Sequence, residues 1–314
     1  MSILVNITGW ESAPWIATLR QLAPERHVTT ATDGPELADV RYAFVWKPQP
    51  GLLGRLPRLE VIVNLGAGVD AILSDTTIPT SIPIIRAMDP NITGRMVEWV
   101  TLQVLFHHRQ MPAYIAQQRD SVWNDLHQRA ASALTVGILG AGVLGQASAD
   151  ILMRLGFNVV GWSRTERQGL PFPCYHGTGC LPAFLGQSDI LVCLLPLTPE
   201  TRGILDFGLL RQLKRNGPLG GPVLINAGRG AEQVEADILR ALDDGTLVGA
   251  TLDVFQTEPL PAASPLWRHP RLVITPHVAA DSEPEAMIVY VLDQIARHER
   301  GEPMDKVVDR ARGY

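Results

Sequence analysis

Short apolar runs alternate with longer amphipathic stretches in the first third of the chain. Two of the intervening stretches, Ala13–Leu22 and Leu52–Leu56, are predicted to form helices or turns. Four apolar runs are strand-like: Ser2–Ile7, Tyr42–Trp46, Val61–Leu65 and Ile82–Ile85. Because these runs are continuous rather than alternating, they are typical of strands buried on both faces of a parallel sheet. The pattern therefore predicts a β-α-β unit.

A long helix is predicted over Thr93 to Met111. This segment contains no proline, and apolar residues recur four positions apart at Met96, Val100 and Val104. The next segment, Pro112 to Leu134, is more polar and is predicted to be an arm rather than a core element.

A second α/β block begins at Leu134. Its strand-like runs are Thr135–Leu139, Asn158–Trp162, Ile190–Leu195, Val223–Asn226, Val248–Leu252 and Leu272–Thr275. Helical spacing is found in Leu144–Leu155, in Ala231–Leu242 and in the tail segment Glu283–Arg297. Six strands with helical crossovers are what a doubly wound nucleotide-binding domain requires.

A glycine pattern, Gly140-x-Gly142-x-x-Gly145, connects the first strand and helix of this block. The context is that of a dinucleotide-binding fingerprint, since an apolar strand precedes it and a second strand follows within one βαβ length. The first glycine allows the turn, the second lets the backbone approach a pyrophosphate, and the third lets helix and strand pack closely. Val143 and Leu144, between the glycines, are predicted to contact the same cofactor. The alternative is a glycine-rich turn without a ligand.

The second strand of this unit ends in Trp162, Ser163 and Arg164, with Arg167 close behind. An NAD site usually has Asp or Glu here to accept from the ribose 2′-hydroxyl. That acid is missing, and guanidinium groups that suit a 2′-phosphate are in reach. We therefore expect NADPH to be preferred, with NADH possible. The alternative is a solvated surface arginine.

Three further motifs follow predicted strands and contain Arg229, Glu258 and His277. In an open parallel sheet the carboxyl ends of strands line one crevice, so these residues can converge. Histidine is a natural proton donor near neutral pH, a neighbouring carboxylate orients it, and arginine holds a substrate carboxylate. The alternatives are a structural ion pair between Arg229 and Glu258, and an ordinary loop histidine.

Several motifs in this order resemble the D-isomer-specific 2-hydroxyacid dehydrogenase family over nearly the whole chain. They are Asn64–Asp70, the glycine pattern, Leu195–Thr201 and the segments of Arg229, Glu258 and His277. Within the family, the chain is similar to the glyoxylate/hydroxypyruvate reductase A type. The local features behind that similarity are Val45–Lys47, His108–Pro112, Trp162–Arg164, Ser264–Trp267 and Val308–Tyr314.

The resemblance implies a role for each matching residue. Arg229 would bind substrate, Glu258 would support His277, and His277 would be the acid–base. The substrate would also meet Leu65, Gly66, Ala67 and Gly68, and the consecutive N–H groups of Ala67 and Gly68 would form an anion nest for its carboxylate. Trp46 would line the substrate pocket, or be an ordinary core tryptophan. The cofactor would contact Leu195, Pro196, Thr201, Ala227 and Asp253, with Asp253 near the nicotinamide amide.

Two local departures from the family pattern are visible. The segment Lys214–Pro222 is long and rich in glycine and proline. Gly228 stands where relatives often have alanine, and a glycine there is expected to hold Arg229 less tightly. Neither departure removes a catalytic group.

Composition narrows the possible partners and compartments. The net charge is −5, without a basic block, which argues against a nucleic-acid partner. The sequence has neither a run of 18 apolar residues nor a signal peptide, so we expect no membrane partner. Three cysteines in 314 residues favour reduced thiols and the cytoplasm.

Two sets of potential metal ligands carry little weight. Cys174, His176 and Cys180 lack an evident fourth ligand for a structural zinc site, so we expect no metal. His107 and His108 are neighbours on the predicted helix and point to different faces, so one buried and one surface histidine are expected.

Together these features predict an α/β protein of two Rossmann-like or flavodoxin-like domains with doubly wound parallel sheets. The substrate domain would be discontinuous, comprising residues 1–98 and 285–314. Residues 99–284 would form the NAD(P)-binding domain with a dimerisation arm, since the resemblance implies a homodimer joined by the long helix and the arm around Trp123. The alternative for these two elements is helical core and a surface loop.

The resulting expectation is an NADP-dependent 2-hydroxyacid dehydrogenase that reduces glyoxylate to glycolate and hydroxypyruvate to D-glycerate. Two alternatives stay open: a reductase of bulkier 2-keto acids, and a dinucleotide-sensing, corepressor-like binding protein.

Overall fold

A computed structural model describes residues 2–9, 11–66, 68–86, 90–280 and 283–310 of the chain. The chain divides into two compact units. One comprises Met1–Ile92 with Ser282–Tyr314, and the other comprises Thr93–Asp281. Each unit is built on one parallel sheet, which confirms the predicted α/β class.

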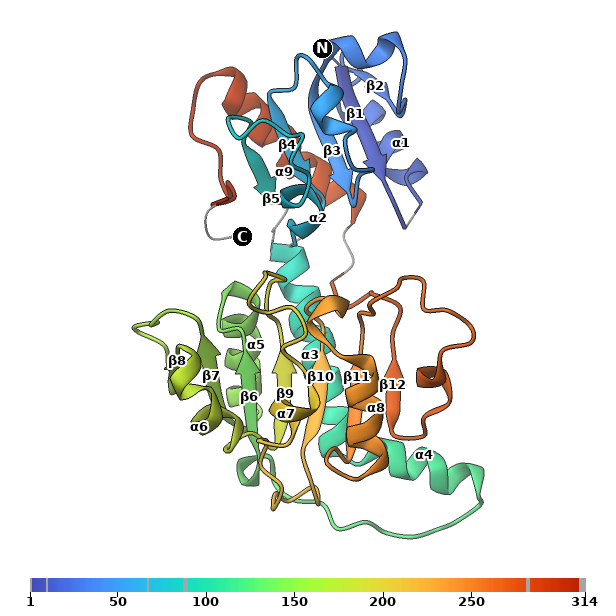
Figure 1. Ribbon diagram of the computed structural model, residues 1–314, viewed down its shortest axis with the longest axis vertical. Helices are drawn as coiled ribbons and strands as arrows, with labels where there is room; N and C mark the ends of the chain where they lie inside the picture. The colour runs from blue at the N-terminus through green and yellow to red at the C-terminus, as the bar shows by residue number, and fades with distance from the viewer. Residues whose placement is uncertain (1, 10, 67, 87–89, 281–282, 311–314) are drawn as a thin grey trace. The chain divides into compact units, whose positions relative to one another are not determined.

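The N-terminal unit contains a five-stranded sheet of order β2-β1-β3-β4-β5, the flavodoxin-like order (Figure 1). Its strands are β1 Ser2–Ile7, β2 His27–Thr29, β3 Val40–Trp46, β4 Val61–Asn64 and β5 Ile84–Arg86. Its helices are α1 Ala13–Leu22, α2 Asp70–Leu73 and α9 Pro284–Glu299, with 3₁₀ turns at Pro35–Asp39 and Leu53–Arg55. On one side of the sheet the 3₁₀ turns and α2 complete an apolar core around Leu4, Ile62 and Ile84. Helices α1 and α9 pack together, and α9 buries Met287, Ile288, Val291 and Ile295.

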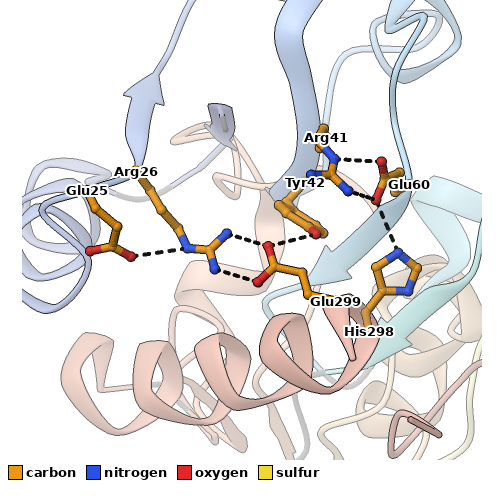
Figure 2. Close-up of polar contacts among 7 residues, drawn as sticks. All are labelled: Glu25, Arg26, Arg41, Tyr42, Glu60, His298 and Glu299. Atoms are coloured by element: carbon orange, nitrogen blue, oxygen red, sulfur yellow. Dashed lines mark hydrogen bonds and ion pairs between the residues drawn. The ribbon is translucent and has the colours of Figure 1, made fainter. Parts of the chain in front are cut away.

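A cluster of polar side chains ties the end of α9 to the start of the strands (Figure 2). We call it the α9 polar cluster: Glu25, Arg26, Arg41, Tyr42, Glu60, His298 and Glu299. Arg26 donates to both oxygens of Glu299, each at 2.9 Å, and the Tyr42 hydroxyl donates to the same carboxylate at 3.1 Å. Arg41 pairs with Glu60 through bonds of 2.6 and 2.7 Å. The last turn of α9 is therefore fixed to β3 and to the residues that precede β2 and β4.

From the α9 polar cluster we expect part of the free energy of unfolding to be lost at acid pH. Hydrogen bonds from Arg41 and Arg26 hold the pKa values of Glu60 and Glu299 below the usual value of about 4.5. Their contribution to the free energy of unfolding is therefore fully present above about pH 4.5 and is lost as the pH falls through the lower folded-state pKa values. The Glu299→Gln protein should be less stable than the wild type by about 1 kcal/mol at pH 7, because the pair is partly exposed.

Thermal unfolding of both proteins between pH 7 and pH 3 measures this difference, which should shrink at the acid end. Glu25→Gln is a matched control, since Glu25 is exposed and lies 3.5 Å from Arg26. A gap in melting temperature that stays constant across the pH range would contradict the assignment.

The C-terminal unit contains a seven-stranded parallel sheet of order β12-β11-β10-β9-β6-β7-β8 (Figure 1). Its strands are β6 Thr135–Leu139, β7 Asn158–Ser163, β8 Cys174–His176, β9 Ile190–Cys193, β10 Val223–Asn226, β11 Gly249–Leu252 and β12 Leu272–Ile274. The helices are α3 Pro90–His108, α4 Met111–Arg119, α5 Val143–Arg154, α6 Leu181–Leu185, α7 Phe207–Leu210 and α8 Glu235–Asp243. Short 3₁₀ turns lie at Ala131–Ala133, Thr178–Cys180, Gly230–Glu232 and Pro265–Arg268.

Helices cover both faces of this sheet. On one face, α3 and α5 bury Val100, Val104 and Leu152 against strand residues such as Ile138 and Ile225. On the other, α6, α7 and α8 bury Phe184, Leu210 and Ile238 against Leu191 and Leu252. This double coverage explains the continuously apolar strands. The strand order reverses between β6 and β9, so the loop after β6 lies at a topological switch point, where such folds bind ligands.

The structure differs from the sequence-based expectations in four elements. Strands β2 and β8 were missed, because each is a three-residue edge strand with little apolar signal. The first part of the predicted arm is helical, since Pro112 lies in the first turn of α4, where proline is tolerated. The predicted helix Ala231–Leu242 begins later, at Glu235, because Gly230–Glu232 forms a 3₁₀ turn.

The expectation of one buried and one surface histidine on α3 is wrong, because both side chains are buried. His107 Nε2 lies 2.8 Å from the Thr251 hydroxyl of β11, and burial lowers the pKa of His107 to about 4. His108 packs edge-on against Phe157. Within the described part of the chain, none of the helices is long and apolar enough to cross a membrane.

Candidate active site

The residues predicted to carry chemistry follow strands of the C-terminal sheet. Because all its described strands are parallel, their carboxyl ends lie at one edge (Figure 1). The loop after β6 carries the glycine pattern, and β7 ends at Ser163. The loops after β9, β10, β11 and β12 begin at Leu194, Ala227, Asp253 and Thr275.

Each of the three glycines at the β6–α5 junction has a different structural role. Gly140 has φ +116°, and a β-carbon there would lie 2.8 Å from the carbonyl of Leu194. A β-carbon at Gly145 would overlap the carbonyl oxygen of Gly140. A β-carbon at Gly142, which caps α5, would meet no described atom within 4 Å. The backbone is therefore closely packed at Gly140 and Gly145 and open at Gly142. A helix N-terminus that binds a pyrophosphate requires such an open approach.

The neighbouring predicted cofactor contacts lie around this loop. Val143 is 57 % exposed at the start of α5, and Leu144 is half-buried. Trp162 and Ser163 are buried at the end of β7, where the Ser163 hydroxyl donates to the carbonyl of Thr165 at 2.6 Å. Arg164 is exposed. It directly follows β7, where the carbonyl of Trp162 accepts the N–H groups of Gly140 and Ala141, both at 3.0 Å.

The loop after β9 is fixed by its own hydrogen bonds. The Thr201 hydroxyl accepts from the N–H of Thr198 and donates to the carbonyl of Pro196, both at 2.7 Å. Leu195 is buried, and Ala227 N–H donates to the carbonyl of Cys193 at 3.1 Å. Thr201 therefore shapes the loop, a contribution that sequence reasoning did not foresee.

The loop after β10 holds Arg229 through its backbone. The N–H of Arg229 donates to Glu232 Oε2 at 2.9 Å, and its Nη1 donates to the carbonyl of Gly228 at 2.7 Å. Gly228 N–H donates to Asn226 Oδ1 at 3.0 Å. A β-carbon at Gly230 would overlap the backbone of Phe255. The expectation of a loosely held Arg229 is therefore wrong, since this loop is tightly bonded and closely packed.

His277 and Glu258 form a pair. His277 Nδ1 lies 2.9 Å from Glu258 Oε2, and Glu258 Oε1 accepts from the N–H of Phe255 at 3.0 Å. With the carboxylate facing Nδ1, the imidazole is oriented and Nε2 remains as the atom that can exchange a proton with a ligand. The side chains are about a quarter and a fifth exposed, at 27 % and 20 %. Both side chains are therefore partly accessible to solvent.

Asp253 holds the loop that carries His277 through several hydrogen bonds. Its carboxylate accepts from the Thr275 hydroxyl at 2.5 Å and from the N–H groups of Val278 and Ala279 at 2.9 and 3.0 Å. Its carbonyl accepts from the N–H of His277 at 2.8 Å. These bonds hold His277 at φ +59°, a conformation that few non-glycine residues adopt. The sequence indicated the acid at the strand end but not its role in holding this loop.

The predicted substrate loop of the N-terminal unit follows β4. Asn64 Nδ2 donates to the carbonyls of Gly66 and Gly68 at 2.6 and 2.8 Å. Trp46 is buried, and a β-carbon at Gly66 would overlap its ring. Leu65 is fully buried, and Ala67 lies outside the described residues. Asn64 is thus the residue that shapes this loop.

The structure also describes the three cysteines and the glycine- and proline-rich segment Lys214–Pro222. Cys174, Cys180 and Cys193 are free thiols, and the described residues contain no cluster of three His, Cys, Asp or Glu side chains placed to hold a metal. In the glycine- and proline-rich segment, Lys214 pairs with the buried Asp189 at 2.9 Å. Gly217 packs against the same carboxylate.

Comparison with known proteins settles the family. The model for the D-isomer specific 2-hydroxyacid dehydrogenase NAD-binding domain matches residues 101–279, a range that contains the glycine loop, Arg229, Glu258 and His277. The chain belongs to the D-isomer-specific 2-hydroxyacid dehydrogenase family. Two relatives named glyoxylate/hydroxypyruvate reductase A, from Yersinia enterocolitica and Escherichia fergusonii, are 38 % and 41 % identical, and each match covers 100 % of both chains.

Solved structures of this dehydrogenase family show the same fold. The NADPH-dependent glyoxylate/hydroxypyruvate reductase of Sinorhizobium meliloti, in complex with NADP and sulfate, is 46 % identical with a TM-score of 0.94. A probable 2-hydroxyacid dehydrogenase from Rhizobium etli, in complex with NADP, HEPES and L(+)-tartaric acid, is 44 % identical with a TM-score of 0.92. Both matches cover 100 % of this chain and 99 % of the other.

Proposed function

We propose that this dehydrogenase uses NADPH to reduce small 2-keto acids, converting glyoxylate to glycolate and hydroxypyruvate to D-glycerate. The observation that carries the proposal is the His277–Glu258 pair, set at the strand ends of a dinucleotide-binding sheet whose β10 loop holds Arg229. The names of the full-length relatives, glyoxylate/hydroxypyruvate reductase A, agree with this activity.

The open backbone at Gly142 and the exposed Arg164 fit the pyrophosphate and 2′-phosphate of NADPH. When bound, NADPH supplies a hydride to the keto carbon of the substrate. The Arg229 guanidinium binds the substrate carboxylate and polarises the keto group, which favours negative charge on its oxygen. His277 Nε2 donates a proton to that oxygen and completes the hydroxyl group, and Glu258 stabilises the protonated ring beforehand.

The proposed substrate contacts also include the β4 loop. Ala67 and Gly68 would offer backbone N–H groups to the carboxylate, as glycine-rich anion nests do. Leu65 and Gly66 would lie beside them, with the Leu65 N–H donated to the carbonyl of Val45 at 2.9 Å. Trp46 would limit the size of the accepted side chain. Leu195, Pro196, Thr201, Ala227 and Asp253 would line the nucleotide, with Asp253 near the nicotinamide amide.

The activity is tested by following the absorbance of NADPH or NADH with glyoxylate, hydroxypyruvate and phenylpyruvate. Fast NADPH-dependent turnover of the two small acids supports the proposal. Faster turnover of phenylpyruvate would favour a reductase of bulkier acids. Tight NADPH binding without turnover of any acid, together with a stable partner in pull-down, would favour a dinucleotide sensor.

The Arg164→Ala substitution is expected to raise KM for NADPH about tenfold, the value of one charge-assisted hydrogen bond. KM for NADH should stay within about twofold, because NADH has no 2′-phosphate for the guanidinium to bind. Steady-state kinetics with both cofactors measures the effect. Arg154→Ala is the control, since Arg154 pairs with Asp150 at the far end of α5. A wild-type preference for NADH would refute the cofactor assignment.

We further propose that the chain is a homodimer. In the described structure α4 buries none of its residues, and the arm around Trp123 is held to α4 by bonds such as that from Asn124 N–H to Gln117 Oε1 at 3.2 Å. Large apolar side chains on α3, α4 and the arm are exposed: Leu102, Met111, Val122 and Trp123. Large apolar side chains exposed on consecutive elements support an interface there. Sedimentation of wild type and Trp123→Ser decides it, and a monomeric wild type would contradict the dimer.

The free thiols support a cytoplasmic location, and fractionation of cells tests it.

A further inference from the structure

A buried carboxylate lies next to the backbone of Arg229 and has no part in the proton transfer described above. Glu232 is fully buried in the 3₁₀ turn after β10. Its Oε2 accepts the N–H of Arg229 at 2.9 Å and lies 3.6 Å from Cys193 Sγ. A buried carboxylate is costly unless its hydrogen-bond partners are in place, so this one needs a structural reason.

The Cys193 thiol donates a hydrogen bond to that carboxylate and stays protonated. Burial, and then the charge of Glu232, raise the pKa of Cys193 well above its usual value. The thiol therefore keeps its proton and points it at Glu232 from the end of β9. The carboxylate is thus fixed from one side by β9 and from the other by the Arg229 peptide.

The carboxylate occupies the space that a side chain at position 228 would need. A β-carbon at Gly228 would overlap Glu232 Oε2 and would lie 3.0 Å from the carbonyl of Leu195. The Gly228 carbonyl accepts the Arg229 guanidinium at 2.7 Å. The position of the Gly228 carbonyl consequently helps to fix the guanidinium. The Glu232 carboxylate, against which Gly228 packs, in turn fixes the position of that carbonyl.

We propose that Glu232 is a positioning residue for Arg229, acting through contact with Gly228 and a hydrogen bond to the Arg229 backbone. Position 228 must then be glycine because the Glu232 carboxylate leaves no room for a β-carbon, and this glycine does not make the Arg229 loop more flexible. The inference rests on the proposed function, in which Arg229 binds the substrate carboxylate. It assigns part of the substrate affinity to a residue that does not touch the substrate.

The test is a double-mutant cycle of Gly228→Ala and Glu232→Ala, with Glu232→Gln as the conservative variant. Each protein is assayed with NADPH and glyoxylate, and its thermal unfolding is recorded. In the wild-type background Gly228→Ala should raise KM for glyoxylate about tenfold or more, because residues in contact couple strongly. In the Glu232→Ala background the same change should cost no more than about twofold, because the overlapping carboxylate is gone.

Two readouts separate positioning from a general structural effect. KM for NADPH should change by no more than about twofold in these variants, and Glu232→Gln, which keeps a carbonyl oxygen for the Arg229 N–H, should restore most of the glyoxylate affinity. Asp244→Ala is the control, since Asp244 accepts a backbone N–H from Thr246 at 2.8 Å in an exposed turn after α8. It should leave KM for glyoxylate unchanged.

The outcomes are distinguishable from failure of the proposed function. Additive effects of the two substitutions on melting temperature and on KM would overturn the positioning inference. Equal rises in KM for glyoxylate and NADPH would overturn it as well. If the wild type does not reduce glyoxylate, the proposed function fails, and coupling between positions 228 and 232 in thermal unfolding still decides whether the two residues act as one unit.

Discussion

The His277→Gln protein should bind NADPH normally and reduce glyoxylate at least about 100-fold more slowly than the wild type, the scale of a lost general acid. Glutamine can fill the space and donate a hydrogen bond, but it cannot release a proton to the developing alkoxide. The Glu258 carboxylate would remain in place, since its Oε1 is held by the N–H of Phe255. The defect should therefore appear in kcat rather than in folding.

A second histidine provides the matched control for this experiment. His269 Nε2 lies 3.3 Å from Asp243, so it is also an imidazole next to a carboxylate, but it is located away from the strand-end loops that carry Arg229 and Glu258. His269→Gln should retain wild-type turnover. Stopped-flow measurement of NADPH oxidation, with circular dichroism to verify folding, gives both results. Near-wild-type kcat in His277→Gln would remove the histidine from the chemistry.

Much of the C-terminal unit follows from local sequence. Strands such as β6 and β10 are continuously apolar because helices cover both faces of the sheet, so their limits matched the apolar runs. The glycine pattern was predictable because Gly140 and Gly145 meet requirements of the backbone itself, while Gly142 leaves the start of α5 open. Strand β8 could not be predicted in this way, because three partly exposed residues at a sheet edge gain their structure from pairing with β7.

The residues of the candidate site also divide into those that sequence could predict and those that it could not. Arg229, Glu258 and His277 were predictable because each is a distinctive residue type in a motif that follows a strand. The residues that hold them were not. Asp253 acts through hydrogen bonds to the backbone of the His277 loop, and Glu232 through one to the backbone of Arg229. Asn64 acts in the same way on the β4 loop of the other unit. Which backbone groups these side chains reach depends on the path of the loops. Sequence therefore identified the groups that do chemistry, and the structure identified those that position them.

Substitution of Arg229 by glutamine should lower kcat/KM for glyoxylate by at least about 1000-fold. The loss combines a charge-assisted, two-point contact with the substrate carboxylate and the polarisation of the keto oxygen, each worth about 2–3 kcal/mol. Arg229→Lys should recover only part of it, because lysine keeps the charge but lacks the planar fork. The Kd for NADPH should be unchanged in both variants, measured by fluorescence titration.

The control for Arg229 is Arg211→Gln, since Arg211 is exposed at the end of α7 and its guanidinium lies 5.9 Å from the centre of the Phe207 ring. It should leave kcat/KM unchanged, which separates a local effect from a change of net charge. The pattern of loss also separates two roles of Arg229. If the arginine only binds the carboxylate, KM rises and kcat is preserved, because ground state and transition state lose the same contact. If it also polarises the keto oxygen, kcat falls too, and that is the result we expect. A kcat/KM within about threefold of wild type would contradict both roles, because either one alone is worth more than that.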